Sequence, residues 1–484
     1  MGLTDCSKQL RIPKSYAWHR FKVQDRFFVY DTTGYRFYEI DDLAYKLLGL
    51  IPYYPLEIVQ EKIVSEKYYT LKQAQKSLNA ILGIGHQGLF DRQRQLVNLE
   101  SAKAVLDGYK FTNSISDIQL MLAEKCNLAC KYCWCPSNHP SGKLMSQEVA
   151  QSALDMLFEH SSSNEVRITL FGGEPLLNKS LIDYIEIYSK KLAKKFSKKI
   201  TYVMTTNATL LDDKYIDYIV KDNYALMVSL DGPKELHDNQ CPTKLGGGSF
   251  DKAFKNIKKI MKRRTVGVRA TLCHPMPDLK NLISFFIEAG FHVMTLGAAS
   301  NRPESATPYD MRAEDFRSLL KQQEELLDWQ ANYLIRGEKP PYFPQERFYE
   351  MIINNTISQN RSVFNCGAGN HIAGIDVLGN MYPCTKFCGM ENFAIGKSGI
   401  GFDEKRCCEL WLKYLKCIKP FCGKCWAYPI CKGPCIWECA QNNGEFKFSN
   451  LSCKFTKRQI EFATYLAFMK GKKQNEQKEI QQRK

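Results

Sequence analysis

The sequence lacks a long hydrophobic run and a secretory signal. No stretch of about 18 apolar residues, the length that a membrane-spanning helix needs, occurs in the chain. The N-terminal residues contain no apolar segment typical of a signal peptide. We therefore expect no membrane association and a cytoplasmic location. There, thiols stay reduced and clustered cysteines bind metals more often than they form disulfides.

The sequence also lacks a recognisable nucleic-acid-binding module, although its net charge is +16. About a quarter of this positive excess lies in Lys470–Lys484, which is predicted to be a solvated tail. The remaining charge is expected to be spread over the surface, so no nucleic-acid partner is predicted. A basic surface of this kind can attract acidic segments of a peptide.

Composition and length are those of a multidomain globular protein. Hydrophobic residues make up 44% of the chain and charged residues 24%, which is an ordinary globular composition. A chain of 484 residues exceeds what one hydrophobic core supports. We predict, in order, a winged-helix-like recognition domain (1–100), a partial barrel (115–300), a connector with a charged helix over Ala313–Leu334 (301–363), a cysteine-rich domain (364–460) and a charged tail (461–484).

The N-terminal region begins with aromatic-rich strand candidates. Arg26–Asp31 and Gly34–Ile40 are joined by a Thr-Thr-Gly turn, which predicts a β-hairpin. Asp41 and Asp42 are helix-capping residues before a Leu-rich segment, and Thr70 has Gln at capping-box spacing. A hairpin followed by short helices predicts a compact winged-helix-like unit.

Residues 115–300 alternate apolar strand candidates with amphipathic segments such as Gln147–Glu159 and Phe250–Arg263. The strand candidates are Ile118–Ala123, Val166–Phe171, Tyr202–Thr206, Leu226–Leu230, Val266–Leu272 and His292–Leu296. Repeated β–α units predict a parallel sheet with right-handed crossovers, an α/β fold of the partial (β/α)6 TIM-like barrel type. In such sheets the functional side chains gather at the C-terminal ends of the strands.

Cysteine is the residue type that the sequence has in excess, with 19 in the chain. Cys126, Cys130 and Cys133 form a C-x3-C-x2-C triplet directly after the first barrel strand. Structural zinc usually takes four ligands, whereas an iron–sulfur cluster held by three thiolates leaves one iron open to a further ligand. The spacing favours a cluster and leaves zinc as the alternative. Cys135 lies beyond the complete triplet and is interpreted as a spectator.

Polar residues follow the other strand candidates at their C-terminal ends. Two glycines permit close approach of the backbone to a ligand, and a carboxylate can bind an ammonium group. Turn-forming residues would explain any one of these sets, but their ordered series predicts one site lined by successive loops. The sets are Gly172-Gly173-Glu174-Pro175, Thr205-Thr206-Asn207, Ser229-Leu230-Asp231-Gly232-Pro233, and Arg269 with Thr271.

The triplet with Tyr132 before its last cysteine, followed by GGEP, TTN and SLDGP, resembles the radical S-adenosylmethionine (SAM) superfamily over about Ile118–Ala299. The resemblance implies a [4Fe–4S] cluster on Cys126, Cys130 and Cys133, with S-adenosylmethionine bound at its fourth iron. It also implies that reductive cleavage of this cofactor yields a 5'-deoxyadenosyl radical that abstracts a substrate hydrogen. The implied cofactor-binding residues are Gly172, Gly173, Glu174, Asn207, Ser229 and Arg269.

The cysteine-rich region has little periodicity and many cysteines, so it is not expected to build a normal core and should need metal sites or disulfides for stability. Its spacing resembles the SPASM extension of radical enzymes that modify peptides, with a zinc ribbon as the alternative. The resemblance implies two auxiliary [4Fe–4S] clusters, one on Cys422, Cys425, Cys431 and Cys453 and the other on Cys366, Cys384 and Cys435. Some relatives carry an eighth cysteine where this chain has Asn360. The second set would therefore keep an open iron for a substrate thiolate or recruit Cys388, Cys407, Cys408, Cys417 or Cys439.

One loop departs from the family pattern. Many relatives carry an arginine shortly after the position of His237-Asp238, whereas this chain continues Asn239-Gln240-Cys241-Pro242. Substrate contacts in this loop are therefore not inferred from the resemblance.

The N-terminal region, with VYDTTGYRFYEID, resembles the recognition element of peptide-modifying enzymes, in which a leader peptide adds a strand to the hairpin. A capping domain and a DNA-binding winged helix are the alternatives. Together the regions predict an oxidoreductase that matures a ribosomally made precursor peptide by cross-linking, with a Cys thioether first and a carbon–carbon link second. A sulfatase-maturing enzyme and a non-catalytic iron–sulfur regulator remain alternatives. A flavodoxin or ferredoxin-type electron donor is expected, whereas the acceptor residue and the general base are not predicted.

Overall fold

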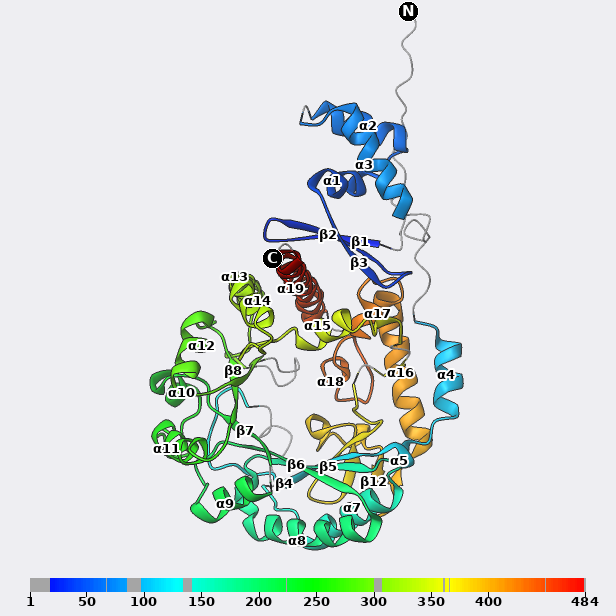
Figure 1. Ribbon diagram of the computed structural model, residues 1–484. Helices are drawn as coiled ribbons and strands as arrows, with labels where there is room; N and C mark the ends of the chain where they lie inside the picture. Colours follow the sequence, from blue (N-terminus) through cyan, green and yellow to red (C-terminus); the bar gives the residue numbers. More distant parts are fainter. Residues whose placement is uncertain are drawn as a thin grey trace, which may run out of the picture.

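The computed structural model describes residues 18–66, 68–84, 97–133, 142–222, 224–299, 307–359, 362–364, 366–448 and 450–482 (Figure 1). The predicted spectator Cys135 and the position of Asn360 lie outside these residues. Within the described ranges, every helix is too short or too polar to cross a lipid bilayer.

The N-terminal unit is a three-stranded antiparallel sheet followed by three helices. The strands are β1 (Trp18–Val23), β2 (Arg26–Asp31) and β3 (Arg36–Ile40), and the helices are α1 (Asp42–Leu50), α2 (Leu56–Ser65) and α3 (Leu71–Ile84). The predicted hairpin is confirmed as β2–β3. Strand β1 was not predicted, because its turn to β2 places Gln24 at φ 51° without the Asn-Gly or Asp-Gly pair that marks such turns.

Capping residues begin two of these helices as predicted. Asp41 accepts a hydrogen bond from the backbone N–H of Ala44 at the start of α1. At the start of α3, the backbone N–H of Thr70 donates to Gln73 Oε1 (2.8 Å) and that of Gln73 donates to Thr70 Oγ1 (3.3 Å). These reciprocal bonds satisfy backbone donors that a helix leaves open at its N-terminus.

The second region forms the predicted partial barrel. Strands β4 to β9 are parallel and adjacent in sequence order, which confirms the expected parallel β–α arrangement. The strands are β4 (Asp117–Ala123), β5 (Glu165–Gly172), β6 (Lys199–Thr206), β7 (Ala225–Ser229), β8 (Gly267–Leu272) and β9 (Val293–Ala298). The helices between them are α7 (Gln147–His160), α8 (Lys179–Phe196), α9 (Asp213–Lys221), α10 (Lys234–Gln240), α11 (Phe250–Met261) and α12 (Leu279–Glu288).

The cysteine-rich region extends the barrel sheet, which the sequence did not predict. Strand β10 (Ile372–Ile375) pairs in parallel with β4, and β11 (Asn380–Tyr382), β12 (Gly396–Lys397) and β13 (Gly401–Phe402) follow in antiparallel pairs. The result is a mixed sheet of ten described strands. Buried side chains such as Ile375 and Trp411 join the same core as the barrel strands. The expectation that this region lacks a normal core is therefore wrong, because its apolar residues pack on a sheet edge supplied by another region.

Helices connect the barrel with the cysteine-rich region. The predicted helix over Ala313–Leu334 is two helices, α13 (Ala313–Glu325) and α14 (Leu327–Ile335), and α15 (Glu346–Ile353) follows. Helix α16 (Glu404–Cys422) lies against α4 (Leu99–Asp107), beside the sheet (Figure 1). Short helices in the described part of the cysteine-rich region are η5 (Thr385–Phe387), η6 (Glu391–Phe393), α17 (Tyr428–Cys431) and α18 (Ile436–Cys439). Helix α5 (Phe111–Ser114) precedes the barrel in the sequence and lies beside β13.

The predicted charged tail from residue 461 is wrong for its first half. Helix α19 runs from Leu451 to Gln482, and Phe462 and Leu466 on it are fully buried. They share a core with Phe21 and Phe28 of the N-terminal sheet and with residues of α14 and α15. Figure 1 shows this dark red helix directly beneath the N-terminal strands. The prediction treated these apolar residues, which recur at helical spacing, as one tail with the charged stretch that follows them.

Candidate functional site

A cavity of about 230 Å³ lies at the C-terminal ends of the barrel strands. All the residues that the sequence assigned to the triplet and to S-adenosylmethionine line this one cavity, together with Thr205, Thr206, Thr271 and Lys386. The assigned lining residues are Cys126, Cys130, Cys133, Gly172, Gly173, Glu174, Asn207, Ser229 and Arg269. Residues from five successive strand ends therefore meet at one place, as the parallel sheet requires.

Gly172 and Gly173 pack against the backbone of the cysteine loop. A Cβ on Gly172 would lie 2.4 Å from the Ala123 carbonyl oxygen, and one on Gly173 would lie 2.4 Å from that of Lys125. Gly172 also adopts φ 142°, which only glycine adopts without strain. The sequence predicted a close approach of backbone to ligand. The structure shows a close approach of backbone to backbone, which holds the loop that carries the triplet.

Glu174 joins the ends of β5 and β6. Its buried carboxylate accepts hydrogen bonds from Leu176 N (3.1 Å), Thr206 Oγ1 (2.8 Å) and Asn207 N (2.9 Å). Burial raises the pKa of this carboxyl to about 7, although the three donors oppose the shift. Three of about four acceptor positions are thus occupied by the protein, so about one is left for an ammonium group.

Asn207 lies beside the first cysteine of the triplet. Its side-chain Nδ2 is 3.7 Å from Cys126 Sγ and 3.0 Å from Asn127 Oδ1, while Leu128 N donates to the same sulfur (3.4 Å). Burial raises the pKa of the Cys126 thiol to about 11, and these donors act in the opposite direction. Asn207 was predicted as a cofactor contact, and its geometry in addition stabilises a thiolate at Cys126.

Ser229 and Arg269 are cross-strand neighbours on β7 and β8. The guanidinium of Arg269 is exposed in the cavity and makes no hydrogen bond or ion pair with any described residue, although buried Asp231 is within electrostatic range. A guanidinium held in this way is suited to a carboxylate. The cavity therefore offers one cation where the resemblance expects a carboxylate contact.

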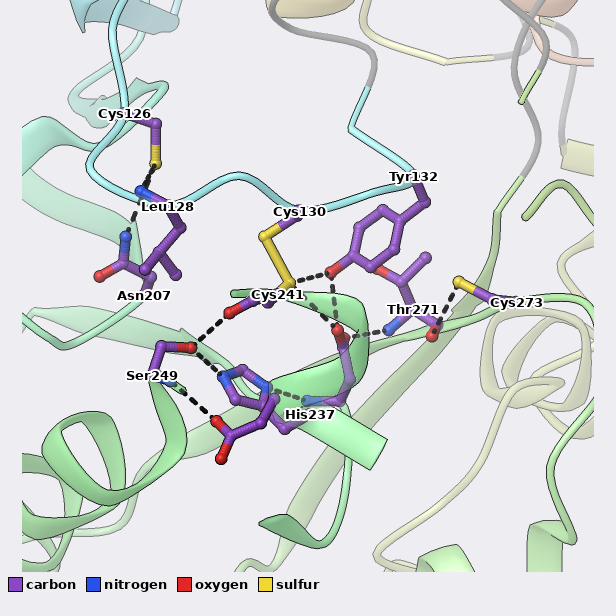
Figure 2. Close-up of a disulfide and its surroundings, with 12 residues drawn as sticks. Cys126, Leu128, Cys130, Tyr132, Asn207, His237, Cys241, Ser249, Thr271 and Cys273 are labelled. Atoms are coloured by element: carbon purple, nitrogen blue, oxygen red, sulfur yellow. Dashed lines mark hydrogen bonds between the residues drawn. A yellow bond between two sulfur atoms is a disulfide. The ribbon is translucent and has the colours of Figure 1, made fainter. Parts of the chain in front are cut away.

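A disulfide joins Cys130 of the cysteine loop to Cys241 (Figure 2). The expectation that the thiols stay reduced is not met at this pair. Cys241 Sγ also lies 3.3 Å from Tyr132 Oη and 3.4 Å from Asp231 Oδ2, and Tyr132 donates to Asp231 (2.9 Å). Cys130 can bind iron only after this bond is reduced. The signal for Cys241 in the sequence was its place in the loop that departs from the family pattern.

The cysteines of the C-terminal region fall into the two predicted groups. Four of them line one small cavity: Cys422, Cys425, Cys431 and Cys453. The other three interact electrostatically with one another: Cys366, Cys384 and Cys435. Burial and the neighbouring thiols raise the pKa of Cys384 and of Cys431 to about 12.

Two of the spare cysteines contact groups outside these sets. The thiol of Cys407 lies 3.8 Å from the Ile395 carbonyl oxygen, and that of Cys408 lies 3.5 Å from Asp107 Oδ1. Among the described contacts, neither thiol touches the group of Cys366, Cys384 and Cys435, and recruitment of a spare cysteine stays a prediction.

The described thiols are not drawn together around a single point. Among the residues that the structure describes, no three His, Cys, Asp or Glu side chains converge closely enough to hold one ion. An iron–sulfur cluster spreads its thiolate ligands around a larger inorganic core, whereas zinc binds its four ligands directly. The auxiliary clusters and the zinc alternative both stay predictions.

Residues 120–282 match the Radical SAM superfamily. The chain therefore carries a radical SAM domain and is a radical SAM enzyme. It is related to anaerobic sulfatase-maturating and peptide-modifying enzymes.

Two curated relatives illustrate this relation. The cysteine-type anaerobic sulfatase-maturating enzyme of Clostridium novyi (strain NT) is 23% identical over 388 residues, which cover 73% of this chain and 97% of that protein. Mycofactocin maturase MftC of Mycobacterium tuberculosis (strain ATCC 25618 / H37Rv) is 26% identical over 332 residues, 65% of this chain and 76% of that protein. The structure of native anSMEcpe with bound AdoMet and Cp18Cys peptide superposes with a TM-score of 0.62 at 19% identity, over 74% of this chain and 99% of that chain. This likeness shows a shared fold.

Proposed function

We propose that this radical SAM enzyme matures a ribosomally made precursor peptide by hydrogen abstraction and cross-link formation, in the first place as a Cys thioether. The observation that carries the proposal is a groove in the N-terminal unit, in addition to the barrel cavity. The groove has a volume of about 580 Å³ and lies between the end of β3 with the start of α1 and one side of α3. Strand β3 pairs only with β2 among the described strands, so its other edge is open to a peptide strand.

The charges of the groove indicate which peptide fits. Its acidic residues are engaged within the protein: Glu39 binds Arg26, Asp41 caps α1, and Asp42 accepts from Tyr69. Lys76 on α3 lines the groove and has no ion pair with a described residue. A leader segment with an apolar side chain facing Ile81 and an acidic one facing Lys76 would complement this surface.

The barrel residues would hold the two cofactors. When bound, the cluster and S-adenosylmethionine supply a 5'-deoxyadenosyl radical for hydrogen abstraction. The triplet would hold the cluster once the bond between Cys130 and Cys241 is reduced. Arg269 would neutralise a carboxylate, and the residual acceptor position of Glu174 would accept from an ammonium group.

The cysteine-rich region supports the thioether form of the cross-link. We infer an auxiliary [4Fe–4S] cluster at each of the two cysteine groups. The group of Cys366, Cys384 and Cys435 has three protein thiolates, and such a set has room for a thiolate from the substrate. A flavodoxin or ferredoxin-type protein as electron donor and a cytoplasmic location complete the proposal. A carbon–carbon cross-link is the second choice for the product.

The test is an anaerobic assay with S-adenosylmethionine, a reductant and the short peptide encoded in the reading frame next to this gene. We expect 5'-deoxyadenosine and a peptide that is lighter by two hydrogen atoms and has one fewer free thiol, because its sulfur is now bonded to carbon. Mass spectrometry measures both products. Cys126→Ala should produce neither. A wild-type chain with reconstituted iron that forms no 5'-deoxyadenosine would contradict the proposal.

Sulfatase maturation is the second candidate, because a relative of that type spans most of this chain. A groove variant separates the two functions better than deletion of the N-terminal unit, whose Phe21 and Phe28 belong to the core around α19. Lys76→Glu should lower modification of a leader-bearing peptide by about tenfold, a loss of one charge-assisted contact. It should leave a leaderless sulfatase peptide unaffected. Lys72→Glu, on the same helix outside the groove, is the matched control.

A further inference from the structure

The cavity of the barrel contains a cation from the cysteine-rich region that no predicted role explains. Lys386 lies on the short helix η5, yet it lines the same cavity as the triplet and Arg269. Its ammonium also interacts electrostatically with the thiols of Cys384 and Cys435. Lys386 therefore lies both at the barrel cavity and near two thiols of the group of Cys366, Cys384 and Cys435.

The protein holds this ammonium in a defined place. Lys386 Nζ lies 4.2 Å from the centroid of the Trp437 ring, and Trp437 is fully buried on α18. Thr385, the residue before it, hydrogen-bonds through its backbone N–H to Gln119 Oε1 on β4 (3.2 Å). The cation–π contact and this anchor fix the position of Lys386 above the barrel strands.

The charges of the cavity are not balanced by the protein. Its lining includes one carboxylate, Glu174, which is already engaged by three donors, and two cations, Arg269 and Lys386. No ion pair of either cation with a described carboxylate is present. S-adenosylmethionine has one carboxylate, and Arg269 is suited to it. Around Lys386 the charged groups are the neighbouring thiols and the Glu438 carboxylate, which acts with Lys386 on the Cys435 thiol.

We propose that Lys386 binds a carboxylate side chain of the precursor peptide, an Asp or Glu at or next to the residue that reacts. This inference rests on the proposed function and names its substrate class. A peptide segment that reaches from the barrel cavity to the group of Cys366, Cys384 and Cys435 passes this ammonium. Lys386 is thus a specificity-determining residue that places an acidic acceptor residue beside a substrate cysteine.

The test compares two peptides and three variants. The peptides are the precursor peptide that the assay above identifies and a copy with every core Asp and Glu changed to Asn and Gln. The variants are Lys386→Gln, Lys386→Arg and, as a matched control on exposed β12, Lys397→Gln. The readouts are the peptide dissociation constant, the KM and kcat of modification, and the iron content of each purified chain.

We expect Lys386→Gln to weaken binding of the acidic peptide and raise its KM by about 10- to 100-fold, the effect of losing one charge-assisted hydrogen bond. The amide peptide should show the same loss on the wild-type chain and no further loss on Lys386→Gln. Lys386→Arg should retain most of the binding, and Lys397→Gln should behave as wild type.

Three outcomes overturn the inference. Equal binding of both peptides by the wild-type chain leaves the proposed function standing and removes the role of Lys386. If Lys386→Gln loses iron but still prefers the acidic peptide to the amide peptide as the wild-type chain does, the ammonium serves the cysteine group and not the peptide. The absence of any modified peptide overturns the proposed function and this inference together.

Discussion

The barrel and the cysteine-rich region gather their cysteines in different ways. In the barrel, Cys126, Cys130 and Cys133 belong to one loop, and two glycines hold that loop against the end of β5. In the cysteine-rich region, each group is collected from separate elements, and Cys453 comes from α19, which also packs under the N-terminal sheet. The first site depends on local geometry, whereas the second depends on the packing of distant segments. Four substitutions test this contrast.

The largest effect is expected from Gly173→Ala. The new Cβ would meet the Lys125 carbonyl oxygen at 2.4 Å and displace the cysteine loop. Displacement by about 1 Å should lower 5'-deoxyadenosine formation by about a hundredfold. Iron content per chain should fall as well, because the three thiols move apart. Gly83→Ala on α3, where an added Cβ meets nothing within 4 Å, is the control and should retain full activity.

The next effect is expected from Phe462→Ala in α19. Its fully buried ring belongs to the core between the N-terminal sheet and α14 and α15. Removing it should lower the free energy of unfolding by about 3–5 kcal/mol, measured by urea denaturation. Lys472→Ala, on the exposed part of the same helix, should change it by less than about 0.5 kcal/mol. A small effect of Phe462→Ala would mean that α19 is not the link between the two regions.

A smaller effect is expected from Cys241→Ser. Without Cys241, Cys130 cannot form the disulfide and stays available for iron. Reconstitution with iron and sulfide in the absence of a dithiol should therefore load more barrel cluster into this variant than into the wild-type chain. A dithiol should remove the difference, because thiol–disulfide exchange frees Cys130. Iron analysis and non-reducing peptide mapping measure the two quantities. Equal loading without a dithiol would show that the disulfide does not limit assembly.

The smallest effect is expected from Asp117→Asn. Asp117 is the first residue of β4, whereas the cysteine loop follows the last residue of that strand. Burial raises the pKa of its carboxyl to about 6, while Arg167 and Thr169 oppose the shift. Because the folded state binds the proton more tightly than the unfolded state, stability should fall as the pH rises from about 4 to about 6. Asp117→Asn should remove this slope and raise the free energy of unfolding at pH 7 by about 1 kcal/mol. If Asp117→Asn left the pH dependence of the free energy of unfolding unchanged, another titratable group would be its cause.

Much of the barrel was predictable because its signals are local. Each of the six parallel strands lies within a few residues of its predicted range, since short apolar runs between amphipathic segments specify β–α units. The polar sets could be assigned to one site because the C-terminal ends of parallel strands meet. The precise contacts were not predictable: Glu174 binds protein donors, and Asn207 lies beside a sulfur.

The cysteine-rich region was predicted less well. The sequence indicated the cysteine groups by spacing but gave no sign that β10 pairs with β4 or that η5 brings Lys386 into the barrel cavity. Pairing between segments about 250 residues apart leaves no periodic signal in either segment. The same holds for the shared core of α19 and the N-terminal sheet.

The site chemistry can be recognised from the amino-acid sequence: three thiols at fixed spacing follow a strand, and glycines, a carboxylate and an arginine follow at the next strand ends. Each of these sets is encoded within a few residues, so a local pattern is sufficient to recognise it. Three contacts become visible in the folded molecule alone: Cys130 pairs with Cys241, α19 joins the two ends of the chain, and Lys386 reaches the barrel cavity. Each of these contacts joins residues distant in sequence, and their meeting depends on how buried surfaces pack together rather than on any local pattern.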